Sequence, residues 1–497
     1  MTDNVKLMFE NEDLRNARRH RLAAGHHLHA STPMDWEPVA LAWLRRQPEP
    51  RQGFLRAYLR KYVGECGGPK ATGHLFQFLQ KALEPVMALT RVALAESLLA
   101  LLDGLLGQVE VSASAADAEG ELERLFLFAA SWSVGGLLEA ADQRKWDEYL
   151  RALTPNVPPK DREGGSAAAG PRRAAAGQGA AQRVEADVIF DFMVNHETCE
   201  WERWQRPEWA YPKRPKNLDF GALLVPTVDS EKATYLLRLM DARRRPVLLV
   251  GGSGTGKTTA ALMYLHGHAD PALLVKKIYF SSATTPGMFQ RTVEGELDKR
   301  GGKNFGPPTG KRLTVFMDDV NMPEVNEWGD QPTLEIVRQL VETRGFYFLD
   351  KDKRGDLKSI EDFSYCAAMN HPSGGQNDVP NRLKRHFFCF NLVLPPEGSI
   401  QSIYGQMLEG CHPRPSGRWS SLRARALPAH GGAWQWCAGH AAHAQVPLQL
   451  QHARAQPRSS PGVFAPKESG EGGDPWRTGG AGAAVAARKC PRTSATS

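Results

Sequence analysis

Apolar positions along the chain recur first at helical spacing and later in short, strand-like runs. Between residues 94 and 105, leucines fall on one face of a helix, which predicts an amphipathic helix packed into a core. Residues 125–151 join an apolar segment to a charged amphipathic one, so they predict two packed helices connected near Gly135-Gly136. Two large aromatics of this segment, Trp132 and Trp146, are expected in the core rather than against a ligand.

The second part of the chain alternates strand and helix signals. Most of its candidate strands are continuous apolar runs, as expected when helices cover both faces of a parallel sheet. The pattern therefore predicts an α/β fold with strands at Pro246–Gly251, Lys277–Ser281, Leu313–Asp318, Phe363–Met369 and Phe387–Leu394.

Composition separates these parts from two low-complexity stretches. Residues 161–184 are rich in Gly and Ala and lack hydrophobic periodicity, which is typical of a flexible linker. Residues 411–497 contain no Ile, Tyr, Asn or Met and have too little apolar surface to offset ordering entropy, so we expect a disordered tail. The folded regions are then 1–160, which is all helical, and 185–405.

Charge and cysteine content narrow the class of protein. The net charge of +7 is concentrated in the tail, where 11 Lys and Arg stand against 3 Asp and Glu, and the rest of the chain is about neutral. We therefore expect no nucleic-acid partner. The sequence has no apolar run long enough to span a membrane, and its 7 cysteines show no CxxC spacing. These features favour an intracellular protein with reduced thiols and no membrane partner.

A glycine-rich segment between the first candidate strand and an apolar helix has the GxxxxGK[ST] pattern of a phosphate-binding loop. Its glycines allow backbone N–H groups to wrap a phosphate at a helix N-terminus. The lysine would contact the β- and γ-phosphates, and the threonine after it would offer its hydroxyl to Mg²⁺. A glycine-rich turn with an incidental lysine is the alternative. The expected nucleotide contacts are Gly251, Gly252, Ser253, Gly254, Thr255, Gly256, Lys257, Thr258 and Thr259.

A second apolar strand ends in two carboxylates, Asp318 and Asp319. Asp318 is expected to hold Mg²⁺ together with Thr258, and Asp319 stands where a glutamate usually polarises the attacking water. Because aspartate is one methylene shorter, we expect binding of ATP or ADP to be better preserved than hydrolysis. Solvated acids that end a strand are the alternative interpretation.

Two further features complete the candidate site. Asn370 ends the strand 363–369, and sheets of this type place that strand between the other two motif strands, so its amide can reach a γ-phosphate or the lytic water. A plain strand-to-turn asparagine is the alternative. Arg382 and Arg385 lie one helical turn apart and either face a neighbouring subunit or are surface charges at a helix end.

Taken together, these motifs resemble the third AAA+ module of a dynein heavy chain, most closely the axonemal outer-arm type. The helical part is similar to the end of the preceding, second module through STPMDWEPVALAWLR (31–45), FAASWSVGG (128–136) and RKWDEYLR (144–151). The resemblance of the second part rests on VPTVDSEKATYLL (225–237), FMDDVNMPEVNEWGDQPTLEIVRQLVE (316–342) and AAMNHPSGGQNDVPNRLKRHF (367–387).

The resemblance implies a P-loop NTPase (AAA+) sheet at 185–405 after the helical end of another module at 1–160. In that family Val225, Pro226 and Thr227 would border the adenine. Arg385 would be an arginine finger that acts across a module boundary, on the nucleotide of the second module. The implied role is a regulatory nucleotide site with weak ATP hydrolysis in a motor fragment.

The resemblance also implies partners and a location. The partners are neighbouring AAA+ modules of a dynein ring and, only through a complete heavy chain, intermediate chains, light chains and microtubules. The location is the cytoplasm and cytoskeleton, in the axoneme of a cilium. Residues 15–30 and those beyond about Gly410 depart from the family pattern, which we interpret as the ends of a truncated or misjoined product.

Two other functions stay open. One is a self-assembling P-loop ATPase that supplies Arg385 in trans to identical neighbours. The other is a scaffold that keeps the fold without hydrolysing ATP.

Overall fold

The computed structural model describes the greater part of the chain up to Cys411. The predicted linker at 161–184 lies outside the described residues, and so does the predicted tail apart from Cys411. The described residues are 36–64, 74–109, 115–159, 187–211, 223–267, 272–349, 351–353, 355–372 and 376–411.

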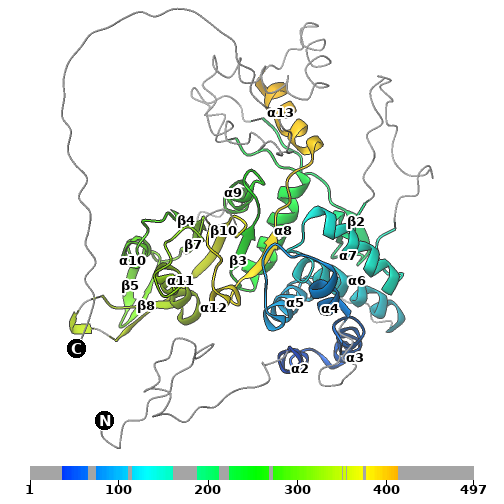
Figure 1. Cartoon of the computed structure of the whole chain (residues 1–497), viewed down its shortest axis with the longest axis horizontal. Coiled ribbons are helices and arrows are strands. Elements are labelled where there is room, and N and C mark those ends of the chain that lie inside the picture. Colours follow the sequence, from blue (N-terminus) through cyan, green and yellow to red (C-terminus); the bar gives the residue numbers. More distant parts are fainter. Residues whose placement is uncertain are drawn as a thin grey trace, which may run out of the picture. The chain divides into compact units, whose positions relative to one another are not determined.

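The first part of the chain is helical, as predicted (Figure 1). The leucine-rich helix α5 (Arg91–Leu106) begins at Thr90, whose side chain accepts a hydrogen bond from the Ala93 N–H, and its leucine face is buried. The two helices predicted around Gly135 are also present, and Trp132 and Trp146 are buried between them and their neighbours. The helical unit comprises α2 (Glu37–Leu44), α3 (Glu49–Tyr58), the π-helical turn η1 (Leu59–Val63), α4 (His74–Ala82), α5, α6 (Ala115–Ser133) and α7 (Ala140–Leu153).

A five-stranded parallel sheet forms the centre of the second part, and all five predicted strands are in it. The main difference from the prediction is that one strand begins at Leu273 rather than Lys277. In spatial order the strands are β11 (Phe388–Asn391), β3 (Val247–Val250), β10 (Phe363–Met369), β7 (Arg312–Asp318) and β4 (Leu273–Tyr279).

Both faces of this sheet are buried, which explains why its strands are continuous apolar runs. Successive side chains of β3 and β10 alternate between two cores: Leu249 and Ala368 belong to one, Leu248 and Ala367 to the other. The first core also contains residues of the helical unit and of α8 (Val228–Ala242) and α9 (Lys257–Gly267). The second contains residues of α10 (Pro286–Glu294) and α11 (Pro332–Thr343).

A second, four-stranded sheet was not predicted from the sequence. Its order is β5-β6-β9-β8, and β5 and β6 form a hairpin whose turn contains Gly302 at φ +57°. The Gly301-Gly302 pair is a hairpin signal that the sequence interpretation missed. These strands are β5 (Asp298–Gly301), β6 (Asn304–Gly306), β8 (Gly345–Tyr347) and β9 (Leu357–Ile360).

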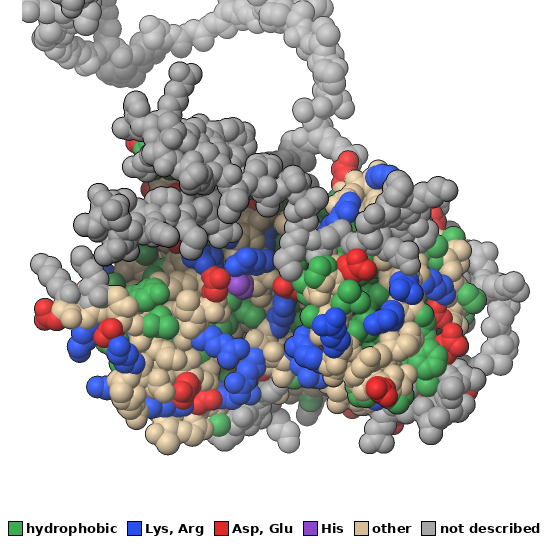
Figure 2. Space-filling view, turned by 90° about the horizontal axis from the view of Figure 1, so that it is seen from below, with side chains coloured by type: hydrophobic (Ala, Val, Ile, Leu, Met, Phe, Trp, Pro, Cys, Tyr) green, Lys and Arg blue, Asp and Glu red, His purple; other side chains and the backbone are tan. Residues whose placement is uncertain are grey.

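Short elements complete the described structure. A small antiparallel hairpin of β1 (Phe192–Val194) and β2 (Trp201–Arg203) follows the turn η2 (Ile189–Asp191). On the face shown in Figure 2, Lys and Arg side chains lie in several separate groups among acidic and apolar side chains. Among the described helices, none is long and apolar enough to cross a membrane. The remaining elements are η4 (Lys351–Lys353), α12 (Asn381–Lys384) and α13 (Glu397–Cys411).

Gly136, just after α6, lies against the carbonyl oxygen of Trp132 in that helix, which yields a stability prediction. A Cβ atom on Gly136 would lie 2.0 Å from the carbonyl oxygen of Trp132 and 3.4 Å from Cβ of Phe390. Gly136→Ala therefore forces backbone to move, and we expect a loss of about 1–3 kcal/mol in the free energy of unfolding. Urea unfolding followed by circular dichroism measures it.

The matched control is Gly53→Ala, inside α3, where a Cβ atom would meet nothing within 4 Å. This change should stabilise the protein by up to about 1 kcal/mol because alanine favours helix. Equal stability of the two variants would contradict the packing described at Gly136.

Candidate nucleotide site

The glycine-rich loop joins the end of β3 to the start of α9. Gly254 and Gly256 have φ of +83° and +84°, a conformation that favours glycine. A Cβ atom on Gly251 would lie 2.6 Å from Oγ1 of Thr255 and 2.9 Å from the carbonyl oxygen of Leu392, so this position is too tight for a side chain. The sequence places glycine where the loop requires it.

Lys257 is the first residue of α9, and its side chain is only 8% exposed. Its Nζ donates to the carbonyl oxygens of Gly251 at 3.0 Å and Gly252 at 2.8 Å, and to Oδ1 of Asn370 at 2.8 Å. An ammonium group has three N–H donors, so all of them are used, and each acceptor is an uncharged oxygen. Burial lowers the pKa of Lys257, against the opposing effect of Asp319 and Asp318.

The two carboxylates at the end of β7 have different surroundings. Asp318 is buried, and its Oδ2 accepts a hydrogen bond from Oγ1 of Thr258 at 2.7 Å, so the two predicted Mg²⁺ ligands are in contact. Asp319 has φ +55°, a left-handed conformation that is uncommon for residues other than glycine. Its Oδ1 accepts a hydrogen bond from Nδ2 of Asn370 at 3.3 Å.

Asn370 connects the loop lysine with the carboxylates at the end of β7. It follows β10, which lies between β3 and β7 as predicted. Its Oδ1 accepts from Lys257 and its Nδ2 donates to Asp319, so one amide bridges the loop lysine and the second carboxylate. The structure therefore brings together Lys257, Thr258, Asp318, Asp319 and Asn370 at one edge of the sheet.

These groups fit a phosphate and a divalent cation. Among the described residues, no oxygen accepts the backbone N–H groups of Gly254 to Thr258, which lie at the N-terminus of α9 where anions bind favourably. Lys257 is a buried cation in contact with neutral oxygens only, and a phosphate would supply its counter-charge. Oγ1 of Thr258 and the carboxylate of Asp318 are oxygen donors of the kind that Mg²⁺ prefers.

The three residues expected near the adenine lie at the start of α8. Val225 is buried, and Thr227 is the N-cap of the helix. Its Oγ1 accepts from the Ser230 N–H at 3.1 Å, and its own N–H donates to Oγ of Ser230 at 2.8 Å. The capping box thus uses the Thr227 side chain. Helix α8, which Pro226 precedes, packs against α9.

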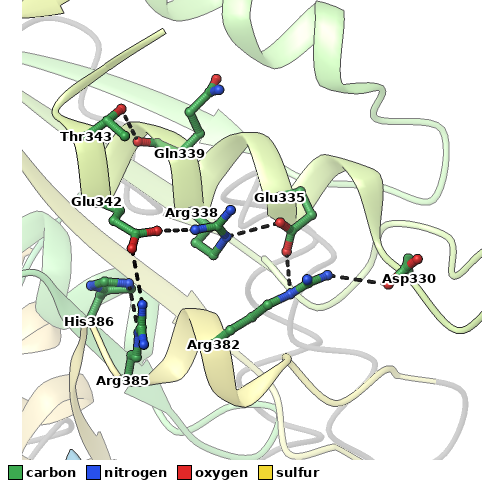
Figure 3. A network of polar contacts seen from close by, with 9 residues as sticks. All are labelled: Asp330, Glu335, Arg338, Gln339, Glu342, Thr343, Arg382, Arg385 and His386. Atoms are coloured by element: carbon green, nitrogen blue, oxygen red, sulfur yellow. Dashed lines mark hydrogen bonds and ion pairs between the residues drawn. The ribbon is translucent and has the colours of Figure 1, made fainter. Parts of the chain in front are cut away.

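The two arginines at α12 contact the neighbouring helix α11 (Figure 3). Nε of Arg382 lies 2.7 Å from Glu335, and Nη2 of Arg385 lies 3.1 Å from Oε1 of Glu342. Arg338 stands between the two glutamates and pairs with both. Arg385 is 54% exposed, and none of its hydrogen bonds in the described part of the chain reaches the loop at 251–258.

Several contacts of the site were not predicted. Asn321 is fully buried, and its Nδ2 donates to the carbonyl oxygen of Asn370 at 3.2 Å, which holds the end of β10. The acidic partners of the arginines, Glu335 and Glu342, were also missed. Their spacing of seven residues along α11, one face of a helix, is the signal that was available.

Comparison with known proteins identifies both parts of the chain. Residues 212–395 match a family model described as the P-loop containing dynein motor region, and residues 70–206 match the dynein heavy chain AAA lid domain. The chain is 37% identical over 413 residues to the "Dynein gamma chain, flagellar outer arm" of Chlamydomonas reinhardtii. The chain belongs to the dynein heavy chain family.

Other dynein heavy chains match a similar share of the chain. The chain is 36% identical over 417 residues to "Dynein axonemal heavy chain 5" of Rattus norvegicus and 34% identical over 414 residues to "Dynein axonemal heavy chain 8" of Homo sapiens. The matches to the three relatives cover 82% to 83% of the chain but only 8% to 11% of the length of those proteins. The dynein chain therefore corresponds to a small part of its relatives, a motor AAA+ module with a lid domain before it.

The electrostatics of this dynein site predict a pH dependence. Burial and the adjacent Asp318 raise the pKa of Asp319, against the opposing effect of Lys257. The folded protein therefore favours the protonated carboxyl of Asp319, and ionisation costs stability. The favourable effect of protonation is complete below the ordinary pKa of aspartate, about 3.9, and is lost as pH rises through the raised value. Without nucleotide or Mg²⁺, Asp319→Asn should increase the free energy of unfolding at pH 7 by about 1 kcal/mol or less, and the gain should disappear toward pH 4.

Urea unfolding at a series of pH values measures this effect. The control is Asp362→Asn, because Asp362 also has a left-handed backbone, at φ +54°, but is exposed. A gain for Asp319→Asn that does not change with pH would show that the backbone conformation, not the buried charge, causes it.

Proposed function

We propose that residues 185–405 form a nucleotide-binding AAA+ module that binds Mg²⁺ with ATP or ADP. The observation that carries this proposal is the buried ammonium group of Lys257, which contacts only neutral oxygens and lies beside the Thr258–Asp318 pair. A nucleotide phosphate would compensate that charge, and Thr258 and Asp318 would hold a divalent cation that compensates the carboxylate. The backbone of residues 251–256 and the side chains of Lys257 to Thr259 bind the phosphates, and Val225 to Thr227 border the base.

In this proposal the site is regulatory and hydrolyses ATP slowly. Asp319 takes the place of the usual glutamate, its carboxylate is one methylene shorter, and it is already bonded to Asn370. Asn370 senses the γ-phosphate. An arginine that completes the site comes from a neighbouring module, and Arg385 serves the nucleotide of the module before this one, after it leaves Glu342.

The partners that we propose follow from the family. Neighbouring AAA+ modules of a dynein ring contact this module directly, whereas intermediate chains, light chains and microtubules are reached through the complete heavy chain. Because the matching relatives are named as flagellar outer-arm and axonemal dyneins, we place the chain in the cytoskeleton of the ciliary axoneme. Homomeric assembly with Arg385 acting in trans remains the alternative, and size measurement in ATP distinguishes it.

Removal of the loop lysine should abolish most of the nucleotide affinity. Lys257→Ala takes away a buried cation from the phosphate, so we expect the dissociation constants of ATP and ADP, measured by isothermal titration in Mg²⁺, to rise at least about thirty-fold. Lys299→Ala, which changes an exposed lysine on β5, should leave both constants unchanged. The absence of nucleotide-dependent heat with the unaltered protein would count against the proposal.

Restoration of the glutamate tests whether the site is a weakened catalyst. Asp319→Glu extends the carboxylate toward the attacking water, and we expect phosphate release from ATP to rise about ten-fold or more. The exposed and equally left-handed Asp362 supplies the control, Asp362→Glu, which should not change the rate. Binding of ATP with no increase for Asp319→Glu would instead support the non-hydrolysing scaffold.

A further inference from the structure

Three neighbouring strands end in line beside the phosphate loop. Met369 of β10 and Asn391 of β11 are both paired with Val250, the last residue of β3, so β3 lies between the other two. Despite this separation, Nε2 of His371, just after β10, lies 3.2 Å from Oδ1 of Asn391. The two side chains therefore meet past the end of β3, where the phosphate loop begins.

Asn391 also holds the helical unit. It is 3% exposed, and its backbone N–H donates to the carbonyl oxygen of Gly136 at 2.7 Å. Its Nδ2 donates to the carbonyl oxygen of Leu138 at 3.2 Å and to Oε1 of Glu139 at 3.1 Å. Glu139 is the N-cap residue of α7, so Asn391 ties the connection between α6 and α7 to the sheet.

The hydrogen-bond pattern assigns the proton on the histidine. Because Nδ2 of Asn391 is the donor toward Leu138 and Glu139, Oδ1 is the acceptor toward His371, and Nε2 of His371 carries a proton. Oε1 of Glu139 lies 3.6 Å from the same Nε2 and favours that proton as well. The three side chains form a continuous polar chain from the start of α7 to the end of β10.

We infer that Glu139, Asn391 and His371 form a polar link through which the helical unit positions Asn370 at the nucleotide site. This inference rests on the proposed function. His371 follows Asn370 directly, and Asn321 holds the carbonyl oxygen of the peptide between them. With His371 released, that peptide has one anchor fewer, and the amide that bridges Lys257 and Asp319 loses its fixed position. His371 is a positioning residue in this arrangement, since it acts through Asn370.

A comparison of ATP with ADP separates positioning from general stability. Asn370 is proposed to contact the γ-phosphate, which ADP lacks, so a displaced Asn370 weakens only the nucleotide with three phosphates. Damage to the phosphate loop or to the fold would weaken both nucleotides together. The ratio of the two dissociation constants is therefore the quantity to measure.

The experiment titrates the full chain with ADP and with the slowly hydrolysed analogue ATPγS, both in Mg²⁺. For His371→Ala we expect the dissociation constant of ATPγS to rise about five-fold or more while that of ADP changes less than about two-fold. His371→Gln, whose amide N–H can still donate to Asn391, should keep both constants near those of the unaltered protein. His196→Ala, at an exposed histidine, is the matched control and should change neither.

Equal weakening of both nucleotides in His371→Ala, or no change in either, would overturn the inference while leaving the nucleotide site intact as a proposal. If His371→Gln behaved like His371→Ala, the donated hydrogen bond would not be the cause, and the inference would also fail. If the unaltered chain bound neither nucleotide, the proposed function itself would be wrong, and the link with it.

Discussion

The buried charge of Lys257 is the constraint around which the nucleotide site is built. A lysine ammonium group at 8% exposure loses much of its hydration, and here only carbonyl and amide oxygens replace it. The carboxylates of Asp318 and Asp319 lie near enough to affect its pKa but make their hydrogen bonds with Thr258 and Asn370. The site thus keeps opposite charges close but not in direct contact, an arrangement that suits a phosphate and a cation.

The order of the parallel strands makes that arrangement possible. The phosphate loop, the Asp318-Asp319 pair and Asn370 are far apart in the sequence. They meet at one edge of the sheet because β10 lies between β3 and β7, and the carboxyl ends of these three parallel strands are adjacent. The helical unit shares one of the two cores with the sheet and reaches β11 through Gly136 and Glu139. For this reason the frame of the site includes residues of the helical unit.

The arginine network on α11 and α12 holds the exposed side chain of Arg385 in an ion pair. Arg385 is paired with Glu342, and Glu342 is shared with Arg338, so the charges of the network are compensated within this module. Exposed pairs of this kind contribute little stability, typically below about 1 kcal/mol. Arg385 can therefore leave Glu342 for a phosphate at small cost, as the proposed function requires.

The sequence alone determined the five central strands, the leucine-rich helix, the phosphate loop and the carboxylate pair. Each of these features is determined by residues close together in the sequence: by apolar runs, by helical spacing, or by glycines such as Gly254 and Gly256 that permit positive φ. Only the tertiary structure decided the oxygens that accept from Lys257, the left-handed backbone of Asp319, the four-stranded second sheet and the partners of Arg385 and His371. Those features join residues distant in the chain. A local pattern can mark one partner, but which residues meet depends on strand order, register and the packing of helices on the sheet.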